Sequence, residues 1–421
     1  MEQIHIRKGL NVPITGEPEQ VISEGNMPKK LAVLGDDYVG MKPTMAVNVG
    51  DRVKLGQVLF SDKKLPRVQY TSPGAGKVIE INRGEKRKFE SVVIELEGHE
   101  EITFPSFKEK EIDDLPREKV VRQLIDSGVW CSLRSRPFGR VANPDIAPHS
   151  IFITAMDTNP LAPQVEKIVE SQKQNFLLGQ KIISKLTDGK LFVCKSPGTP
   201  IPTIELDRLT VAEFSGPHPA GLPGTHIHFL DPVGRHKTVW YIGAQDVIAM
   251  GVLFATGKLH AERIVALSGP AVKNPRLIRT WLGASLNDLV RGELKDGNNR
   301  VISGSVLSGH KSEGPQAYLG RFHQQISALT EGHERKFLGW LGIGKNLFSV
   351  KRILASSFSP YKKFNFTTSL NGGLRSIVPI GNYEKVMPLD LLPTYLLRAI
   401  AVQDVEESEN LGCLELEEDD L

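Results

Sequence analysis

The chain has 421 residues, 40% of them hydrophobic and 24% charged, a composition typical of a globular protein with about two to four domains. The longest uncharged apolar run, residues 247–257, is shorter than the roughly 20 residues of a membrane-spanning helix, and the N-terminal residues form no apolar core of a secretory signal. The three cysteines, Cys131, Cys194 and Cys413, are far apart and odd in number, which indicates a reducing compartment and no cysteine metal site.

The net charge of +3 hides a strong asymmetry along the chain. Residues 404–421 contain nine acidic side chains and no Lys or Arg, which leaves 40 acidic against 52 basic residues in the rest of the chain, a net charge of +12. Residues 335–383, the basic–aromatic segment, contain eight Lys or Arg and no acid. The spacing of its aromatic residues matches no nucleic-acid recognition motif, so we expect no nucleic-acid partner. These aromatic residues include Phe337, Trp340, Phe348, Phe358, Tyr361, Phe364 and Phe366.

Residues 1–105 are predicted to form a barrel-sandwich hybrid, the fold of biotinyl and lipoyl carrier domains. Two stretches, residues 47–60 and 71–81, place Val, Leu and Ile at alternating positions between glycine turns. Gly50 and Gly56 stand where such turns require positive φ. The pattern therefore predicts short strands joined by tight turns.

A carrier domain of this fold holds its prosthetic group on a lysine in a connecting turn, where this chain has Lys63 and Lys64. Pro66 follows closely and fixes the local backbone, and the neighbouring residues are not the small or methionine residues that usually flank a carrier lysine. We therefore predict a solvated lysine pair, with attachment of biotin or lipoate as the alternative.

Residues 106–258 are predicted to form a Rossmann-like α/β domain. An apolar stripe predicts a helix over residues 116–127. Strands at 151–155 and 191–194 flank a long amphipathic helix over 163–186. The order strand, helix, strand is typical of a parallel sheet.

A helix predicted over residues 244–256 leads into residues 259–312, where the order strand, turn, strand, helix, strand indicates a small β-grasp module of the SLBB type. Residues 313–421 mix short helical patterns with irregular chain, which predicts a mainly helical C-terminal domain. The expected fold class is α/β, as a multidomain protein with mixed α and β structure.

Few residues of the chain form a recognisable chemical motif. His226 and His228 could be two metal ligands on one face of a strand, with His218 as a third, or they could pack within a loop rich in Gly and Pro. No phosphate loop, dinucleotide-binding glycine motif, C-x-x-C pair or nucleophile elbow is present. We therefore predict no catalytic, cofactor-binding or metal-binding residue in this chain.

Several stretches of the chain together closely resemble the A-subunit family of the bacterial Na⁺-translocating NADH:quinone oxidoreductase. They extend over almost the whole chain, and the two longest are too specific to arise by chance. The matching stretches are IRKGLNVPITGEPEQ, VGDRVKLGQVLF, INRGEKR, LRSRPFGRV, GPHPAGLPGTHIHFLDPVG, YIGAQDV and FNFTTSLNGGLRSIVPIGNYEKVMPLDLLP.

The resemblance implies a peripheral protein on the cytoplasmic face of the bacterial inner membrane. The complex has six subunits and couples NADH oxidation and ubiquinone reduction to Na⁺ export. The partners would be the other five subunits, chiefly the membrane-embedded B-subunit, which together carry FMN, FAD, riboflavin and an iron–sulfur centre. The A-subunit would hold no cofactor, would not be catalytic alone, and would lie at the quinone end, with ubiquinone possible at its interface. The alternatives are a stand-alone flavoprotein and a biotin or lipoate carrier.

The family is also similar to the flavin-binding subunit of respiratory complex I and to a related ion-pumping ferredoxin oxidoreductase. Those relatives hold FMN phosphate on a glycine-rich loop after the first helix of the Rossmann-like domain. Residues 128–141 stand at this position here, and bulky side chains replace the small residues, so we infer that the flavin pocket is filled. The two arginines are predicted to pair with carboxylates, or otherwise to hold an anion. The replacing residues are Leu133, Arg134, Ser135, Arg136, Pro137 and Phe138.

The resemblance gives a role to the basic–aromatic segment and to the end of the chain. We expect the segment to dock the protein on membrane partners or anionic lipid, because aromatic rings and Lys or Arg suit the headgroup region. The alternative is a surface segment that only keeps the protein soluble. Family members continue past the position of Leu421, so this chain is expected to be shortened there, with Cys413 as the vestige of an iron–sulfur arrangement.

Overall fold

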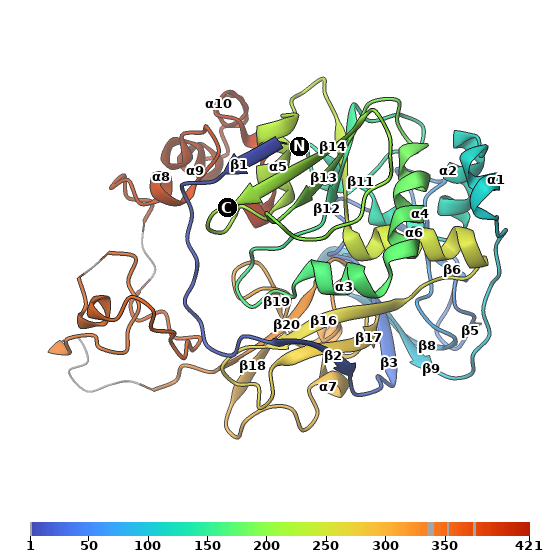
Figure 1. The fold of residues 1–421 in the computed structure, drawn as a ribbon. Coiled ribbons are helices and arrows are strands. Elements are labelled where there is room, and N and C mark those ends of the chain that lie inside the picture. The colour runs from blue at the N-terminus through green and yellow to red at the C-terminus, as the bar shows by residue number, and fades with distance from the viewer. Residues whose placement is uncertain (1, 335–340, 352, 374–375) are drawn as a thin grey trace.

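The computed structural model describes residues 2–334, 341–351, 353–373 and 376–421. The described strands form four sheets, of seven, six, four and three strands. In Figure 1 the seven-stranded sheet and its helices lie above the six-stranded sheet, and the two smaller sheets lie to one side of both. The predicted α/β class with several mixed domains is confirmed.

The two smaller sheets form the barrel-sandwich hybrid, as predicted. They enclose a core that contains buried side chains such as Phe60, Val78 and Val92. Gly50 and Gly56 have the positive φ values, 102° and 85°, that their turns require. One sheet contains β3 (Lys30–Leu34), β9 (Phe89–Leu96), β8 (Gly76–Arg83) and β5 (Arg52–Val53), with η1 (Glu85–Arg87) between β8 and β9, and the other contains β4 (Pro43–Met45), β6 (Val58–Asp62) and β7 (Gln69–Thr71).

The seven-stranded sheet is the Rossmann-like domain, with a parallel centre and one antiparallel edge. The strands predicted at 151–155 and 191–194 are confirmed, and they pair with each other in parallel. In spatial order the strands are β1 (Glu2–His5), β14 (Leu209–Ser215), β13 (Lys190–Lys195), β12 (Ser150–Thr154), β15 (Val239–Gly243), β10 (Arg134–Arg136) and β11 (Arg140–Val141).

The helices of this domain follow the prediction closely, with one break. The amphipathic stretch predicted as one helix over 163–186 forms two, because Gln172 leaves helical geometry at φ −135° and ψ 33°. The helices predicted over 116–127 and 244–256 are confirmed as α2 and α6. The elements are α1 (Glu109–Asp113), α2 (Arg117–Asp126), η2 (Val129–Ser132), α3 (Val165–Ser171), α4 (Lys173–Ser184), α5 (Pro223–Leu230) and α6 (Ala244–Thr256).

Two glycines allow α4 and α6 to pack backbone to backbone. A Cβ at Gly179 would lie 2.0 Å from the Val247 carbonyl oxygen, and one at Gly251 would lie 1.9 Å from the Asn175 carbonyl oxygen.

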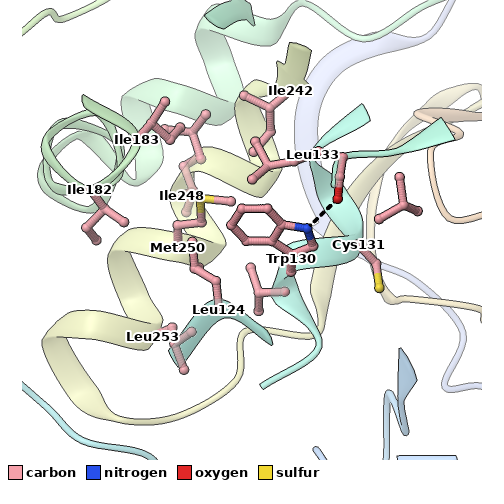
Figure 2. Close-up of a cluster of buried hydrophobic side chains, with 14 of the residues drawn as sticks. Leu124, Trp130, Cys131, Leu133, Ile182, Ile183, Ile242, Ile248, Met250 and Leu253 are labelled. Atoms are coloured by element: carbon pink, nitrogen blue, oxygen red, sulfur yellow. Dashed lines mark hydrogen bonds between the residues drawn. The ribbon is translucent and has the colours of Figure 1, made fainter. Parts of the chain in front are cut away.

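Beside these helices, Trp130 fills the centre of the core, where Figure 2 shows its indole among aliphatic side chains from several elements. The packing of Trp130 against the α4 and α6 helices therefore helps to hold strand β10 in place. This strand follows Trp130 closely in the chain and carries the two arginines.

The six-stranded sheet contains the predicted β-grasp order of strand, strand, helix and strand. It also takes in β20, which lies past residue 312, and the N-terminal strand β2. The strands in spatial order are β19 (His310–Lys311), β18 (Asn299–Ser303), β20 (Gln325–Thr330), β16 (Glu262–Ser268), β17 (Arg276–Trp281) and β2 (Glu19–Glu24), with α7 (Leu286–Leu289) and η3 (Gly314–Gln316) in the connections.

Residues 2–24, the N-terminal arm, join the two large sheets. Its strand β1 pairs in parallel with β14 at one edge of the seven-stranded sheet, and its strand β2 pairs in parallel with β17 of the six-stranded sheet. Between them Ile6 and Ile14 are buried. Figure 1 shows the arm running in dark blue from one sheet to the other. The arm thus belongs to both large sheets rather than to the barrel-sandwich strands that follow it.

The C-terminal region is mainly helical and irregular, as predicted, and its helices α8 to α10 lie beside α5 in Figure 1. Within the described ranges, no helix of the chain is both long and apolar enough to cross a membrane. The elements are η5 (Ala355–Phe358), α8 (Tyr383–Val386), α9 (Pro393–Ala401), α10 (Val405–Asn410), η6 (Cys413–Glu415) and η7 (Glu418–Asp420).

Candidate functional site at the arginine strand

Strand β10 places Arg134 and Arg136 beside β15, at the antiparallel edge of the seven-stranded sheet. Arg134 pairs with Tyr241 in register, and its guanidinium carbon lies 4.6 Å from the centre of that ring and 4.2 Å from the ring of Phe322. Arg134 is therefore stacked between two aromatic faces, a contact that favours a desolvated guanidinium.

Arg136 is bound by the acidic end of the chain. Its side chain is only 1% exposed, and its Nε atom lies 2.6 Å from Glu417 Oε1. Its Nη1 atom donates to Asp420 Oδ2 at 2.7 Å and to the Glu415 carbonyl oxygen at 2.9 Å. The predicted pairing of the arginines with carboxylates is confirmed, since Arg134 also lies 4.0 Å from Glu417.

Further contacts fix the same acidic residues. The Tyr241 hydroxyl donates to Glu417 Oε2 at 2.6 Å, and His228 Nδ1 lies 2.7 Å from Glu415 Oε2. Burial disfavours the charged form of Arg136, but Asp420 and Glu417 outweigh this effect and raise the pKa of its guanidinium above the usual value. Burial likewise raises the pKa of the Tyr241 hydroxyl, which therefore stays protonated and able to donate. Arg136 therefore stays charged, and residues of its own chain surround it.

These acidic partners could not be identified from the sequence, because they lie about 280 residues from the arginines that they neutralise. One sequence signal did point toward them: the last 18 residues are acidic while the rest of the chain is basic. That asymmetry favours contact between the end of the chain and a basic surface, although it does not specify which arginines are involved.

A cavity of about 560 Å³ opens beside the ion cluster, between Arg134, the six-stranded sheet and the C-terminal helices. Six acidic residues line it together with neutral polar side chains, two histidines and Arg134. Ionised carboxylates among them repel phosphate groups. The acidic residues of the lining are Asp36, Asp37, Asp157, Glu417, Glu418 and Asp419.

Comparison with known proteins agrees with the family resemblance of the sequence motifs. Three domain models match the chain: the NqrA N-terminal barrel-sandwich hybrid domain over residues 4–97, the NqrA second alpha/beta domain over 115–259, and the NQRA C-terminal domain over 264–314. The A-subunit of the Na(+)-translocating NADH-quinone reductase of Saccharophagus degradans is 56% identical over 418 residues, which cover 99% of this chain and 94% of the relative. The chain belongs to this A-subunit family.

Other A-subunits of this reductase are nearly as similar. Those of Histophilus somni and Vibrio alginolyticus are each 54% identical, again over 99% of this chain and 94% of the relative. Among solved structures, an NAD⁺-reducing [NiFe]-hydrogenase aligns with a TM-score of 0.37 and 13% identity, over 53% of this chain and 49% of that chain. The family resemblance that the sequence motifs indicated is confirmed.

The three histidines of the possible metal site do not come together in this chain. His226 and His228 lie neither on a strand nor in a loop, the two alternatives considered, but on helix α5, where residues two apart point in different directions. His226 is buried against Phe214 and its Nε2 atom lies 3.1 Å from the Ala220 carbonyl oxygen, while His218 Nδ1 meets Thr158 Oγ1 at 3.2 Å. In the described part of the chain, no group of three or more His, Cys, Asp or Glu could hold a metal ion.

The His226 environment predicts a pH effect on stability. Burial lowers the pKa of His226 to about 3, whereas an unfolded chain has a histidine pKa of about 6.5. Below pH 6.5 the unfolded state binds a proton that the folded state does not, so stability is lost as pH falls and the loss at pH 5 is about 2 kcal/mol. We expect His226→Phe to remove this contribution from denaturant midpoints measured between pH 8 and pH 5. Equal slopes for His226→Phe and wild type would contradict the assignment.

The turn with Lys63 and Lys64 is tied to the loop before β4. Lys64 Nζ donates to the Gly40 carbonyl oxygen at 2.7 Å. The buried Asp62 carboxylate accepts the backbone N–H groups of Lys42 and Lys64 at 3.1 and 3.0 Å. The turn is therefore fastened to its own domain, unlike a free carrier hairpin.

Proposed function

We propose that this chain serves a Na⁺-translocating NADH-quinone reductase as a peripheral subunit on the cytoplasmic face of the inner membrane. In this proposal it holds no flavin, is not catalytic alone, and meets the membrane-embedded B-subunit at the quinone end of the complex. The names of its relatives supply the reaction of the complex. The burial of Arg136 and its ion pairs with Glu417 and Asp420 support the absence of a flavin.

The closed ion cluster carries the proposal that no flavin binds. A flavin phosphate in a Rossmann-like domain needs free backbone N–H groups or free cations at the glycine-rich position. Here Arg136 is ion-paired with both Glu417 and Asp420, and Arg134 is stacked between two rings. Six acidic residues contribute to the lining of the adjoining cavity. An entering phosphate would have to displace two buried ion pairs and then meet these acidic side chains.

Titration of FMN and NADH into the purified chain tests this proposal. We expect no saturable quenching of flavin fluorescence up to about 1 mM ligand, which corresponds to binding weaker than about −4 kcal/mol. The double variant Glu417→Gln, Asp420→Asn frees Arg136 and is the matched control. It tests whether these two carboxylates alone keep flavin out of the site. Stoichiometric flavin beside Arg136 in the wild-type chain would support a stand-alone flavoprotein instead, and a mass increase on Lys63 or Lys64 would support a carrier.

The basic–aromatic segment supports the proposed docking. Part of the segment, residues 335–340, 352 and 374–375, lies outside the described residues. In the described part, Phe358 is 89% exposed and Tyr361 is 96% exposed, and Ile343 and Ile353 are also exposed. Exposed apolar side chains gathered among lysines are typical of a contact surface rather than of a purely solvating one.

Charge reversal in this segment should release the protein from membranes. Each basic residue near an anionic surface contributes about 1 kcal/mol at most, so four reversals should shift the chain from the membrane fraction to the supernatant. Lys363 pairs with exposed Glu17, a contact worth about 0–1 kcal/mol, so folding should survive. The fraction that sediments with membranes and the NADH–quinone activity are measured together. The reversed residues are Lys351, Arg352, Lys362 and Lys363.

A matched quadruple reversal on the barrel-sandwich domain controls for the change in net charge. It uses exposed lysines that form no salt bridge among the described residues, and it should leave the chain on the membrane. If the segment variant stays bound and active, the docking role is wrong. The control residues are Lys29, Lys54, Lys63 and Lys77.

A further inference from the structure

Helix α9 presents a second apolar face to solvent. Leu396 is buried with Met387 and Leu389 on the side of the helix that packs against the rest of the chain. Tyr395 and Val402 point elsewhere, and they are 62% and 75% exposed. Because these two residues are seven apart, they lie on one face of the helix. Exposed apolar side chains that share a helix face are typical of a contact surface.

An acidic border adjoins this face. The Asp404 N–H donates to the Ala399 carbonyl oxygen at 2.9 Å, so the chain turns directly from α9 into α10. Val405, the first residue of α10, is exposed as well. Three exposed acids beside it form no salt bridge among the described residues. We call these residues the α9–α10 surface: Leu392, Tyr395, Val402, Asp404, Val405, Glu406 and Glu407.

The charge of this surface disfavours two possible occupants. Anionic lipid would meet three carboxylates, with Arg398 of α9 as the nearby cation in the sequence, so its headgroups would be repelled. A second copy of the chain, packed symmetrically on the same face, would bring the same carboxylates together. A protein segment that carries Lys or Arg beside apolar side chains complements both the apolar face and its acidic border.

We propose that the α9–α10 surface binds a basic amphipathic segment on the cytoplasmic side of a membrane-embedded partner. The inference rests on the proposed place of this chain in a membrane-bound reductase. Cytoplasmic segments next to membrane-spanning helices carry an excess of Lys and Arg, which is the charge that this surface lacks. The apolar side of the segment covers Tyr395 and Val402, and its basic side meets Glu406 and Glu407, as when an amphipathic helix lies in an apolar groove.

The α9–α10 surface and the basic–aromatic segment have opposite charge and are joined to each other. Arg398 Nη2 donates to the Ile377 carbonyl oxygen at 3.4 Å, and Ile377 belongs to the basic–aromatic segment. The basic segment suits anionic lipid, whereas the acidic surface suits a basic protein segment. The two surfaces therefore divide contact with lipid and contact with protein between them.

Photo-crosslinking in cells identifies the occupant. The tagged full chain carries p-benzoylphenylalanine in place of Tyr395, and the crosslinked peptides from illuminated membranes are mapped by mass spectrometry. We expect a crosslink to a Lys- and Arg-rich cytoplasmic segment of a membrane-embedded protein. The same probe at exposed Val49 of the barrel-sandwich domain should give no crosslink to that segment. Crosslinks only to lipid, to a second copy or to soluble proteins, or no crosslink at all, would overturn the proposal.

Two double variants separate the apolar contact from the charges. Tyr395→Ser with Val402→Ser should lower the amount of membrane partner that co-purifies with the chain about tenfold, because buried apolar anchors dominate such contacts. Glu406→Lys with Glu407→Lys should lower it most at low salt, where charge repulsion is least screened. All four side chains are exposed in this chain, so its urea midpoint should stay unchanged in both variants.

A matched control and the wild-type chain keep this inference apart from the proposed function. Glu205→Lys with Asp207→Lys reverses two exposed acids of the Rossmann-like domain that form no salt bridge among the described residues, and should leave co-purification unchanged. If the wild type and the Tyr395, Val402 variant retain membrane partners equally, only the role of the α9–α10 surface is wrong. If the wild-type chain retains no membrane protein, the proposed function fails and this inference fails with it.

Discussion

Replacing Arg136 by glutamine should lower the free energy of unfolding by about 3–5 kcal/mol, because it leaves the carboxylates of Glu417 and Asp420 buried without their cation. The Asp420 side chain is almost fully buried, and Tyr241 satisfies only one oxygen of Glu417. Glutamine can replace a hydrogen bond but not the charge. Urea denaturation followed by circular dichroism measures the effect as a lower midpoint with an unchanged slope.

Two further variants separate charge from packing at this position. Combining Arg136→Gln with Glu417→Gln and Asp420→Asn removes all three charges, so we expect it to restore most of the lost stability. Arg235→Gln breaks an ion pair with Glu409 in which the arginine is exposed, and should change stability by less than about 1 kcal/mol. The account of the ion cluster fails if Arg136→Gln unfolds at the same urea concentration as the wild-type chain.

The parts of the fold that the sequence predicted are those built from local patterns. Alternating apolar residues around Gly50 and Gly56 predicted the barrel-sandwich strands, because turn geometry and strand period act within a few residues. The strand–helix–strand order around β12 and β13 predicted the parallel sheet for the same reason. In each case the deciding interactions join neighbours in the sequence.

The parts that the sequence could not predict depend on distant partners. Strands β1 and β2 are short edge strands whose pairing with β14 and β17 exists only in the folded chain. Helix α5 was not predicted: the alternation of His226 and His228 suggested a possible strand and the Gly and Pro residues a loop, while Pro223 at its first turn favours a helix start. A long-range partner or a helix-starting proline outweighs a short periodic pattern.

The candidate site also contains residues that the sequence could identify and partners that it could not. Arg134 and Arg136 could be singled out from the sequence, because the resemblance to flavin-binding proteins led us to expect small residues at these positions. Their partners Glu417, Asp420 and Tyr241 come from two other parts of the chain. Charge asymmetry limits the choice of partner to the acidic end, but only the fold determines which carboxylate reaches which guanidinium.

Trp130 is the second position where one substitution should strongly destabilise the chain. Trp130→Ala should lower the free energy of unfolding by about 3–5 kcal/mol, since the large indole is fully buried and its removal leaves a cavity. Figure 2 shows the indole among aliphatic side chains, including Ile248 and Met250 of helix α6, with its Nε1 atom donating to a carbonyl oxygen. That oxygen belongs to Ala142, at 2.7 Å.

The comparison of Trp130→Phe with Trp130→Ala separates the hydrogen bond from the packing. Phenylalanine keeps an aromatic ring against Trp240, whose ring centre lies 5.5 Å away, but leaves the Ala142 carbonyl oxygen without its donor. We expect about 1–3 kcal/mol of destabilisation for Trp130→Phe and clearly more for Trp130→Ala, measured by urea denaturation. If both variants lose the same amount, the hydrogen bond rather than the packing holds β10 in place. A small loss for Trp130→Ala would show that α4 and α6 close over the empty site, although their glycine contacts at Gly179 and Gly251 already lie at minimal separation.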